Sequence, residues 1–352
     1  MSRYWSKVTG VLTPYVPGEQ PLDQRLVKLN TNESPYPPSP SVREAISSAS
    51  DDDLRRYPDP ESCALREAIA ARNGLEPHSV FLGNGSDEVI ALCFMSLLKH
   101  DLPLYFPDIS YSFYPVWAGL FDVSYKKVPV CNDFTIDPSA YPTKSGGIII
   151  PNPNAPTGIL MSLESIRVLL ERCRDSVVVI DEAYIDFGGE SAAQLIPDFD
   201  NLLVVQTMSK SRSLAGLRVG FAMGDPALIE GLNRVKNSFN SYPLDVLAQR
   251  AALAAIGDEE YFAECCGRIV ESRRKLTEGL LARYFDVLPS HANFVFARHR
   301  DQSARLLFQG LREHGIIVRH FERDRIDNFL RISVGTDEAN NALLGALDEL
   351  LK

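Results

Sequence analysis

Short apolar runs that alternate with helix-length segments are the feature that most constrains the fold of this chain. The runs lie at 80–82, 104–106, 148–150, 177–180, 202–205 and 219–223, with a weaker strand candidate at 123–130. Candidate helices lie between them, at 86–98, 162–172 and 226–237. Continuous apolar runs of this length indicate strands that are buried on both faces of a mostly parallel sheet. The sequence therefore predicts an α/β fold with ligands at the carboxyl ends of the strands.

The pattern changes after Tyr242 and Pro243, and 352 residues are enough for two domains. A long helical stretch is predicted at 244–282, with a break near Gly257 and Asp258. Strand-like segments at 292–297, 316–319 and 330–334 follow, with helices at 303–314 and from Asp337 onward. The proline-rich first 50 residues indicate an extended arm. We therefore predict an arm with part of the small domain at 1–45, a large cofactor-binding domain at 46–243, and a small α+β domain at 244–352.

Charge and composition exclude several functional classes. The formal charge of −10 and the absence of a basic block disfavour a nucleic-acid partner. No apolar run reaches the length of a membrane span or of a signal-peptide core, so we expect a cytoplasmic protein without a membrane partner. The six cysteines and six histidines show no metal-ligand spacing, and we predict free thiols and no metal.

Lys210 is the first candidate for chemistry, because it follows the apolar run 202–205 in a segment rich in small hydroxyl residues. Only a neutral amine attacks a carbonyl carbon, so such lysines need burial or a neighbouring cation to lower their pKa. Arg218, eight residues later, can supply that cation and can also bind a phosphate. Taken alone, the same pattern also fits a solvated surface lysine.

Three loops that follow predicted strands add weaker signals. The segment 83–88 fits an anion site at a helix N-terminus, but it also fits an ordinary capped turn. Asp181 either keeps a heterocyclic nitrogen protonated or caps a helix. The segment 152–158 is either a rigid turn that fixes a side chain in place or a plain loop. The order of these segments along the chain is far more specific than any one of them.

With these segments in this order, the chain resembles the fold-type I pyridoxal-phosphate aminotransferases, and within them the histidinol-phosphate aminotransferase family. The resemblance covers nearly the whole chain and includes the segments 12–15, 29–36, 56–59, 181–187, 315–319 and 330–336. It implies a pyridoxal 5′-phosphate cofactor in the large domain. It also implies a homodimer with shared active sites.

The resemblance further implies roles for single residues around the cofactor. Lys210 would carry the internal aldimine and then move a proton, while Asp181 would pair with the pyridine nitrogen and make the ring an electron sink. Tyr184 would hydrogen-bond the ring 3′-oxygen, and Tyr111 would stack on the ring. The cofactor phosphate would be held by Arg218, Ser209, the backbone N–H groups of Ser86 and Asp87, and Tyr57 of the neighbouring subunit.

Two positions depart from the family pattern. Ile109 stands where the family usually has proline, two residues before Tyr111. Ala155 stands where the family usually has the asparagine that bonds the ring 3′-oxygen. We expect Asn154, one residue earlier, to make that contact, and otherwise Tyr184 makes it alone.

For the substrates, the resemblance implies an anion-binding set of Arg319, Arg331, Tyr15 and Asn32. One arginine pair can bind phosphate and carboxylate in turn, because both present bidentate oxygens. Surface salt bridges are the alternative role for the two arginines.

The implied reaction is a ping-pong transamination between L-histidinol phosphate and 2-oxoglutarate, in histidine biosynthesis. The alternatives are an aromatic-amino-acid aminotransferase that uses Arg331 for the carboxylate, and a threonine-phosphate decarboxylase. A non-catalytic ligand sensor is disfavoured because Lys210 is intact and no basic helix-turn-helix segment precedes residue 30.

Overall fold

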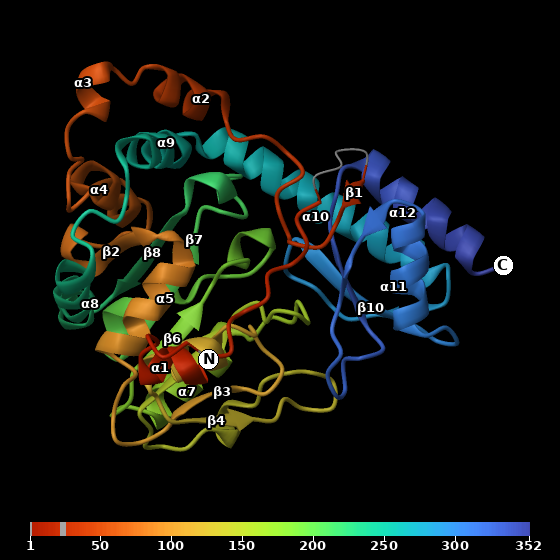
Figure 1. Ribbon diagram of the computed structural model, residues 1–352, viewed down its shortest axis with the longest axis horizontal. Coiled ribbons are helices and arrows are strands. Elements are labelled where there is room, and N and C mark those ends of the chain that lie inside the picture. Colours follow the sequence, from red (N-terminus) through yellow and green to blue (C-terminus); the bar gives the residue numbers. More distant parts are fainter. Residues whose placement is uncertain (1, 22–25) are drawn as a thin grey trace.

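The computed structural model describes residues 2–21 and 26–352, and it divides into a large and a small part (Figure 1). A central sheet organises the large part. Its strands lie in the order β2 (Val80–Asn84), β8 (Val219–Gly224), β7 (Leu202–Thr207), β6 (Val178–Asp181), β5 (Gly147–Pro151), β3 (Leu104–Pro107) and β4 (Tyr125–Val128). All neighbouring strands are parallel except the two pairs that β8 forms. The mostly parallel sheet predicted from the sequence is therefore confirmed.

Strand β8 is antiparallel because no crossover helix connects it to β7. A parallel connection needs a crossover of a dozen or more residues, usually an α-helix. The segment between β7 and β8 contains only the short 3₁₀ turn Ala215–Leu217. This same segment carries Lys210.

Helices cover both faces of the central sheet, which explains its continuous apolar runs. One face packs against α4 (Cys63–Arg72), α7 (Leu163–Arg172) and α9 (Val246–Gly257), and the other against α5 (Gly85–Ser96), α6 (Tyr114–Phe121) and α8 (Pro226–Phe239). Along β5, Ile148 and Ile150 enter the first core while Ile149 enters the second. Successive side chains of a strand point to opposite faces, so every position of such a strand must be apolar.

A four-stranded antiparallel sheet organises the small part. Its order is β12 (Arg319–His320), β13 (Leu330–Ser333), β10 (Phe294–His299) and β9 (Phe285–Val287). The helices α10 (Glu259–Leu281), α11 (Ala304–Glu313) and α12 (Asp337–Leu350) pack on it. The early strand β1 (Val27–Lys28) pairs with β11 (Ile316–Ile317), which attaches the N-terminal segment to the small part.

Helix α9 belongs to the core of the large part. Ala248, Ala251 and Ala252 are buried there, and α9 packs against α4 and α2 (Pro40–Ser47). The break predicted between α9 and α10 is present, and the Asp258 side chain caps α10 by accepting a hydrogen bond from the Tyr261 N–H. We therefore propose that the domain boundary lies at this break, rather than at residue 243.

The first 50 residues are not wholly extended, contrary to the prediction. They contain α1 (Lys7–Val11) and α2, and α3 (Asp51–Leu54) follows directly. Proline starts α2 instead of preventing it, because Pro40 occupies the first turn, where its missing N–H costs nothing. No helix in the described part of the chain is long and apolar enough to cross a membrane.

Candidate active site

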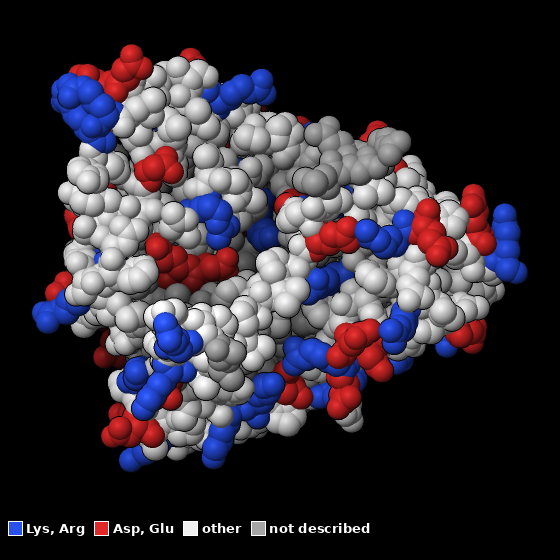
Figure 2. Space-filling model, in the orientation of Figure 1, with Lys and Arg blue, Asp and Glu red and all other residues white. Residues whose placement is uncertain are grey.

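A cavity with an open volume of about 1040 Å³, including the part open to solvent, lies at the carboxyl ends of β5, β6 and β7. The small part and the N-terminal segment close it from the other side, and the surface in Figure 2 is hollowed near its centre with Lys or Arg atoms inside. It brings together twelve of the predicted site residues: Tyr15, Asn32, Ser86, Asp87, Tyr111, Asp181, Tyr184, Ser209, Lys210, Arg218, Arg319 and Arg331. Residues far apart in the sequence thus form one site.

Lys210 projects into this cavity just beyond the end of β7. Its Nζ donates a hydrogen bond to the Thr31 carbonyl at 3.0 Å. Burial lowers the pKa of Lys210 from its ordinary value to about 8, and the positive charge of Arg331 lowers it further than that of Arg218 does. A minority of the amine is therefore neutral near physiological pH, a far larger share than for a lysine with its ordinary pKa. The cation with the larger effect on this pKa is therefore Arg331 of the small part, rather than Arg218.

Asp181 ends β6 and is almost fully buried on the floor of the cavity. Its Oδ2 accepts a hydrogen bond from the Tyr114 hydroxyl at 2.8 Å. Its Oδ1 is buried and has no hydrogen-bond partner among the described residues. Burial raises the pKa of Asp181 to about 6, against the lowering effect of the Tyr114 hydrogen bond. Asp181 does not cap the helical turn that follows, whose N-cap residue is Tyr184.

Tyr184 is oriented by Asn32. The Asn32 Nδ2 donates to the Tyr184 hydroxyl oxygen at 3.1 Å, and the Ser333 hydroxyl donates to the Asn32 Oδ1 at 3.0 Å. Because the Tyr184 oxygen already accepts from Asn32, its own proton is free to be donated to a ligand. Asn32 lines the cavity, as predicted, but its side chain serves Tyr184.

An anion cradle lies where β2 runs directly into α5. The side chain of Asn84, the N-cap residue, accepts no hydrogen bond from the helix, so the first N–H groups of α5 remain available for an anion. Arg218 lies at this end of α5, where its Nη2 bonds the Asp87 carboxylate at 3.0 Å and its Nη1 donates to the Ser209 hydroxyl at 3.4 Å. The structure thus favours the anion site over the ordinary capped turn.

Gly220 makes this cradle possible, since a Cβ there would lie 2.2 Å from the Ser86 nitrogen. We expect Gly220→Ala to displace the start of α5, because backbone atoms cannot yield as a flexible side chain can. Cofactor affinity should fall roughly 10-fold and stability by about 1–3 kcal/mol, as in overpacked sites. Calorimetric titration and thermal unfolding measure both quantities.

Gly216→Ala is the matched control, because a Cβ at this exposed position, in the 3₁₀ turn just before β8, meets no atom within 4 Å. If Gly216→Ala lowered cofactor affinity as much as Gly220→Ala, the close approach of Gly220 to Ser86 would not be responsible.

Arg319 and Arg331 are opposite each other on the paired strands β12 and β13. Like charges placed opposite in this way repel. Neither arginine forms an ion pair with a carboxylate in the described part of the chain, and Arg331 has its Nη2 bonded to the Asn30 carbonyl at 2.8 Å. An anion bound between the two guanidinium groups would relieve the repulsion. Both arginines line the cavity, and this arrangement favours an anion site over surface salt bridges.

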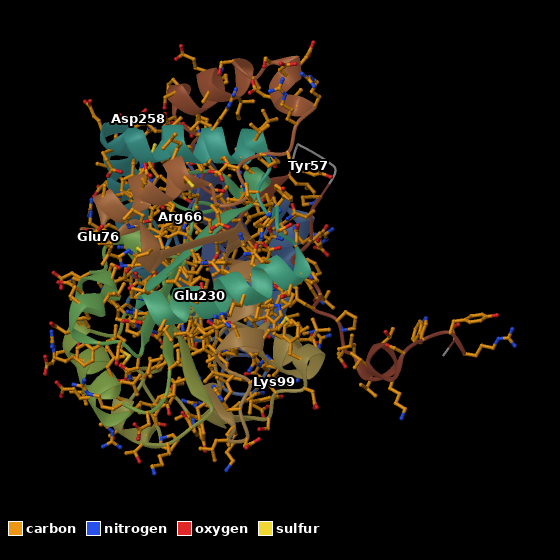
Figure 3. All side chains as sticks on the ribbon, turned by 90° about the vertical axis from the view of Figure 1, so that its left-hand side faces the viewer. Tyr57, Arg66, Glu76, Lys99, Glu230 and Asp258 are labelled. Carbon is orange, nitrogen blue, oxygen red and sulfur yellow. The ribbon has the colours of Figure 1, made fainter. Side chains whose placement is uncertain are left out.

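Tyr57 and Asn154 lie outside the cavity. Tyr57 is 83% exposed and stacks on Tyr242 with ring centroids 4.7 Å apart, on the side of the molecule shown in Figure 3. Asn154 is buried, and its Nδ2 donates to the Ile109 carbonyl at 3.0 Å. Ala155 lines the cavity in its place, so within this chain Tyr184 is the predicted donor that remains for a ring oxygen.

Several site residues were not predicted. Tyr114 holds Asp181, the Thr31 carbonyl accepts from Lys210, and Asn30 accepts from Arg331 through its backbone oxygen. The last two act through backbone atoms, which no side-chain pattern reveals. For Tyr114 the only signal is its place beside Tyr111, at the start of α6. No group of potential metal ligands occurs among the described residues.

Known proteins similar to this chain share its whole length. Residues 24–347 match the family described as aminotransferase class I and II. The chain is 58% identical over 352 residues to histidinol-phosphate aminotransferase 1 of Hydrogenovibrio crunogenus, covering 100% of this chain and 99% of that protein. The histidinol-phosphate aminotransferase of Pseudomonas entomophila is also 58% identical, over 348 residues that cover 99% of this chain and 100% of that protein. This chain belongs to the histidinol-phosphate aminotransferase family, within the class I and II aminotransferases.

The fold agrees with this family membership. The crystal structure of the histidinol-phosphate aminotransferase from Sinorhizobium meliloti in complex with pyridoxal-5′-phosphate has a TM-score of 0.89 with this chain. The two are 24% identical, and the match covers 100% of this chain and 98% of the other. The fold class and the family resemblance predicted from the sequence are confirmed.

The residues of the cavity fit pyridoxal phosphate. The cofactor has an aldehyde, a basic ring nitrogen and a phosphate, and each finds a distinct partner. Lys210 is an amine with a lowered pKa, the orphaned Oδ1 of Asp181 is an acceptor for a ring N–H, and the α5 cradle with Arg218 is a phosphate site.

Proposed function

We propose that this enzyme transfers the amino group between L-histidinol phosphate and 2-oxoglutarate with pyridoxal phosphate, by a ping-pong mechanism. The observation that carries the proposal is the Arg319 and Arg331 pair, which faces the same cavity as Lys210. The two full-length relatives bear the name histidinol-phosphate aminotransferase. Both substrates are anionic, one through a phosphate and the other through carboxylates.

When bound, pyridoxal phosphate supplies an electron sink for the charge that develops at the substrate carbon. Asp181 would hold the ring nitrogen protonated, and Tyr184 would donate a hydrogen bond to the ring oxygen. The neutral Nζ of Lys210 would accept the proton from the substrate carbon and serve as the donor for its return. Burial and the charge of Arg331 keep this amine a competent base near pH 8.

Arg331 and Arg319 hold the phosphate of the first substrate and then a carboxylate of the second. A guanidinium group binds either anion through two parallel hydrogen bonds, so one site can serve the two half-reactions. Tyr15 contributes an aromatic wall at this end of the cavity, where its ring lies 6.4 Å from that of Tyr111. This arrangement orients the amino group of the substrate toward Lys210.

The test is an absorbance titration of the cofactor-loaded protein with L-histidinol phosphate, followed by 2-oxoglutarate. We expect the first to remove the absorbance of the lysine-bound cofactor and the second to restore it. Phenylalanine and threonine phosphate are added in parallel. Conversion by phenylalanine alone would favour the aromatic-amino-acid alternative, and release of CO₂ from threonine phosphate would favour the decarboxylase.

We further propose a homodimer in which Tyr57 completes the site of the partner. Apolar side chains are exposed around it, including Tyr242 and Phe239, which is 74% exposed. Helix α1 has no buried residue, and in Figure 3 it projects away from the rest of the chain. A second copy would cover both surfaces.

Subunit complementation tests the shared site. In the proposed dimer, each site combines Lys210 of one subunit with Tyr57 of the other. A mixed dimer of Lys210→Ala and Tyr57→Ala subunits therefore contains one site with both residues intact. We expect a mixture of the two inactive variants, unfolded and refolded together, to regain activity that neither has alone. An inactive mixture whose mixed dimer is demonstrated by mass spectrometry would contradict the proposed role of Tyr57.

We also propose, from composition and charge, a cytoplasmic location without a membrane or nucleic-acid partner. Fractionation of the source cells, with the protein detected by antibody, tests the location and the membrane association.

A further inference from the structure

Tyr114 is a buried polar residue that the reaction described above does not use. It is the first residue of α6, is fully buried, and donates through its hydroxyl to the Asp181 Oδ2 at 2.8 Å. Its ring packs among aromatic side chains, with Phe106 and Tyr111 each 5.7 Å away between centroids. A hydroxyl held by such packing cannot follow Asp181 if the carboxylate rotates.

The two oxygens of Asp181 are therefore not equivalent. Oδ2 is bound to Tyr114, whereas Oδ1 is buried without a partner in the described part of the chain. A buried acceptor without a partner is costly. Because Asp181 also lines the cavity, a ligand bound there can supply the missing donor. Only Oδ1 is left for the ring nitrogen of a cofactor.

We propose that Tyr114 is a positioning residue that fixes the Asp181 carboxylate and presents one oxygen to the ring nitrogen of pyridoxal phosphate. The proposal rests on the proposed function, because it requires that the cofactor occupy this cavity. Tyr114 itself does not line the cavity and acts only through Asp181.

The hydrogen bond also favours the ionised form of Asp181. Burial raises the pKa of this carboxyl to about 6, and the Tyr114 hydroxyl lowers it. The other titratable groups near Asp181 and Tyr114 are Asp87 and Cys93 on α5, Tyr184 after β6, and Tyr111. Of these, the negative charge of Asp87 raises the pKa of Asp181, while the Ala183 N–H lowers it. Without Tyr114, Asp181 would take up a proton at a higher pH.

The test measures the affinity of the cofactor-free protein for pyridoxamine 5′-phosphate, which forms no covalent bond to Lys210. We expect the Tyr114→Phe variant to bind pyridoxamine 5′-phosphate roughly 10-fold more weakly, because a hydrogen bond to a charged group is lost. The loss of affinity in acid, which accompanies protonation of Asp181, should move to higher pH in the variant. Calorimetry across a pH series gives both values, without any measurement of turnover.

Tyr141→Phe is the matched control. Tyr141 is buried in the same domain, and its hydroxyl has no hydrogen-bond partner among the described residues. We expect its variant to bind as the wild-type protein does. Thermal unfolding of both variants establishes that each is folded.

A double-mutant cycle separates positioning from a general structural role. Asp181→Ala should weaken binding, and Tyr114→Phe should then add no further loss, because its only route to the cofactor is gone. Equal losses with and without Asp181, or wild-type affinity in Tyr114→Phe, would overturn the proposal. Failure of the wild-type protein to bind the probe would instead overturn the proposed cofactor site.

Discussion

Lys210→Ala should lower turnover by about 10⁴-fold or more, while the protein remains folded. The substitution removes both the amine that attaches the cofactor and the group that moves the proton, and general acid–base catalysis alone contributes about 10²–10⁴-fold. Steady-state rates with L-histidinol phosphate and 2-oxoglutarate measure the loss. Methylamine added in solution should restore part of the rate if the missing group is a base.

The stability of Lys210→Ala follows from the same pKa shift. Folding lowers the pKa of Lys210 from 10.5 to about 8. The charged amine therefore destabilises the folded state at neutral pH. This destabilisation is lost as the pH rises through the two values and is absent above both. We expect the Tm of the variant at pH 7 to equal or exceed that of the wild-type protein. Lys99→Ala, at an exposed lysine that Figure 3 labels, is the control and should change neither rate nor Tm. A large fall in Tm would show that Lys210 is mainly structural.

Arg331→Gln should raise the KM for both substrates on the order of 100-fold. Arg331 is half-buried with its Nε atom buried, and loss of one partner of a desolvated charge pair costs about 3 kcal/mol. Because the charge of Arg331 also lowers the pKa of Lys210, that pKa should rise in the variant, and the acid limb of the rate profile should move to higher pH. Steady-state kinetics across a pH series reports both effects.

Arg305→Gln is the matched control for this prediction. Arg305 is exposed and forms a 3.7 Å ion pair with Glu322, and exposed pairs of this kind contribute little. We expect no change in either KM. If Arg331→Gln affected only one of the two substrates, the idea that a single arginine pair serves both half-reactions would be wrong.

The sequence predicted the central sheet well because local composition is decisive there. Strands such as β5 and β6 are buried on both faces, so their sequences are continuously apolar and visible without any tertiary information. The residues at their carboxyl ends, among them Asp181 and Lys210, follow directly from this pattern, since parallel strands deliver their ends to one edge of the sheet. The antiparallel direction of β8 was not visible, because a short connection leaves no helical signal.

The fold class, the family and most of the side chains that line the site could be read from the order of motifs along the chain. How those side chains are used depends on the folded arrangement. Asn32 serves Tyr184, Asn154 is turned away to Ile109, and Arg331 outweighs Arg218 in its effect on Lys210. Each outcome depends on distances and burial between segments that are remote in sequence. Electrostatic and hydrogen-bond energies fall off with distance in space, so no linear pattern reports them.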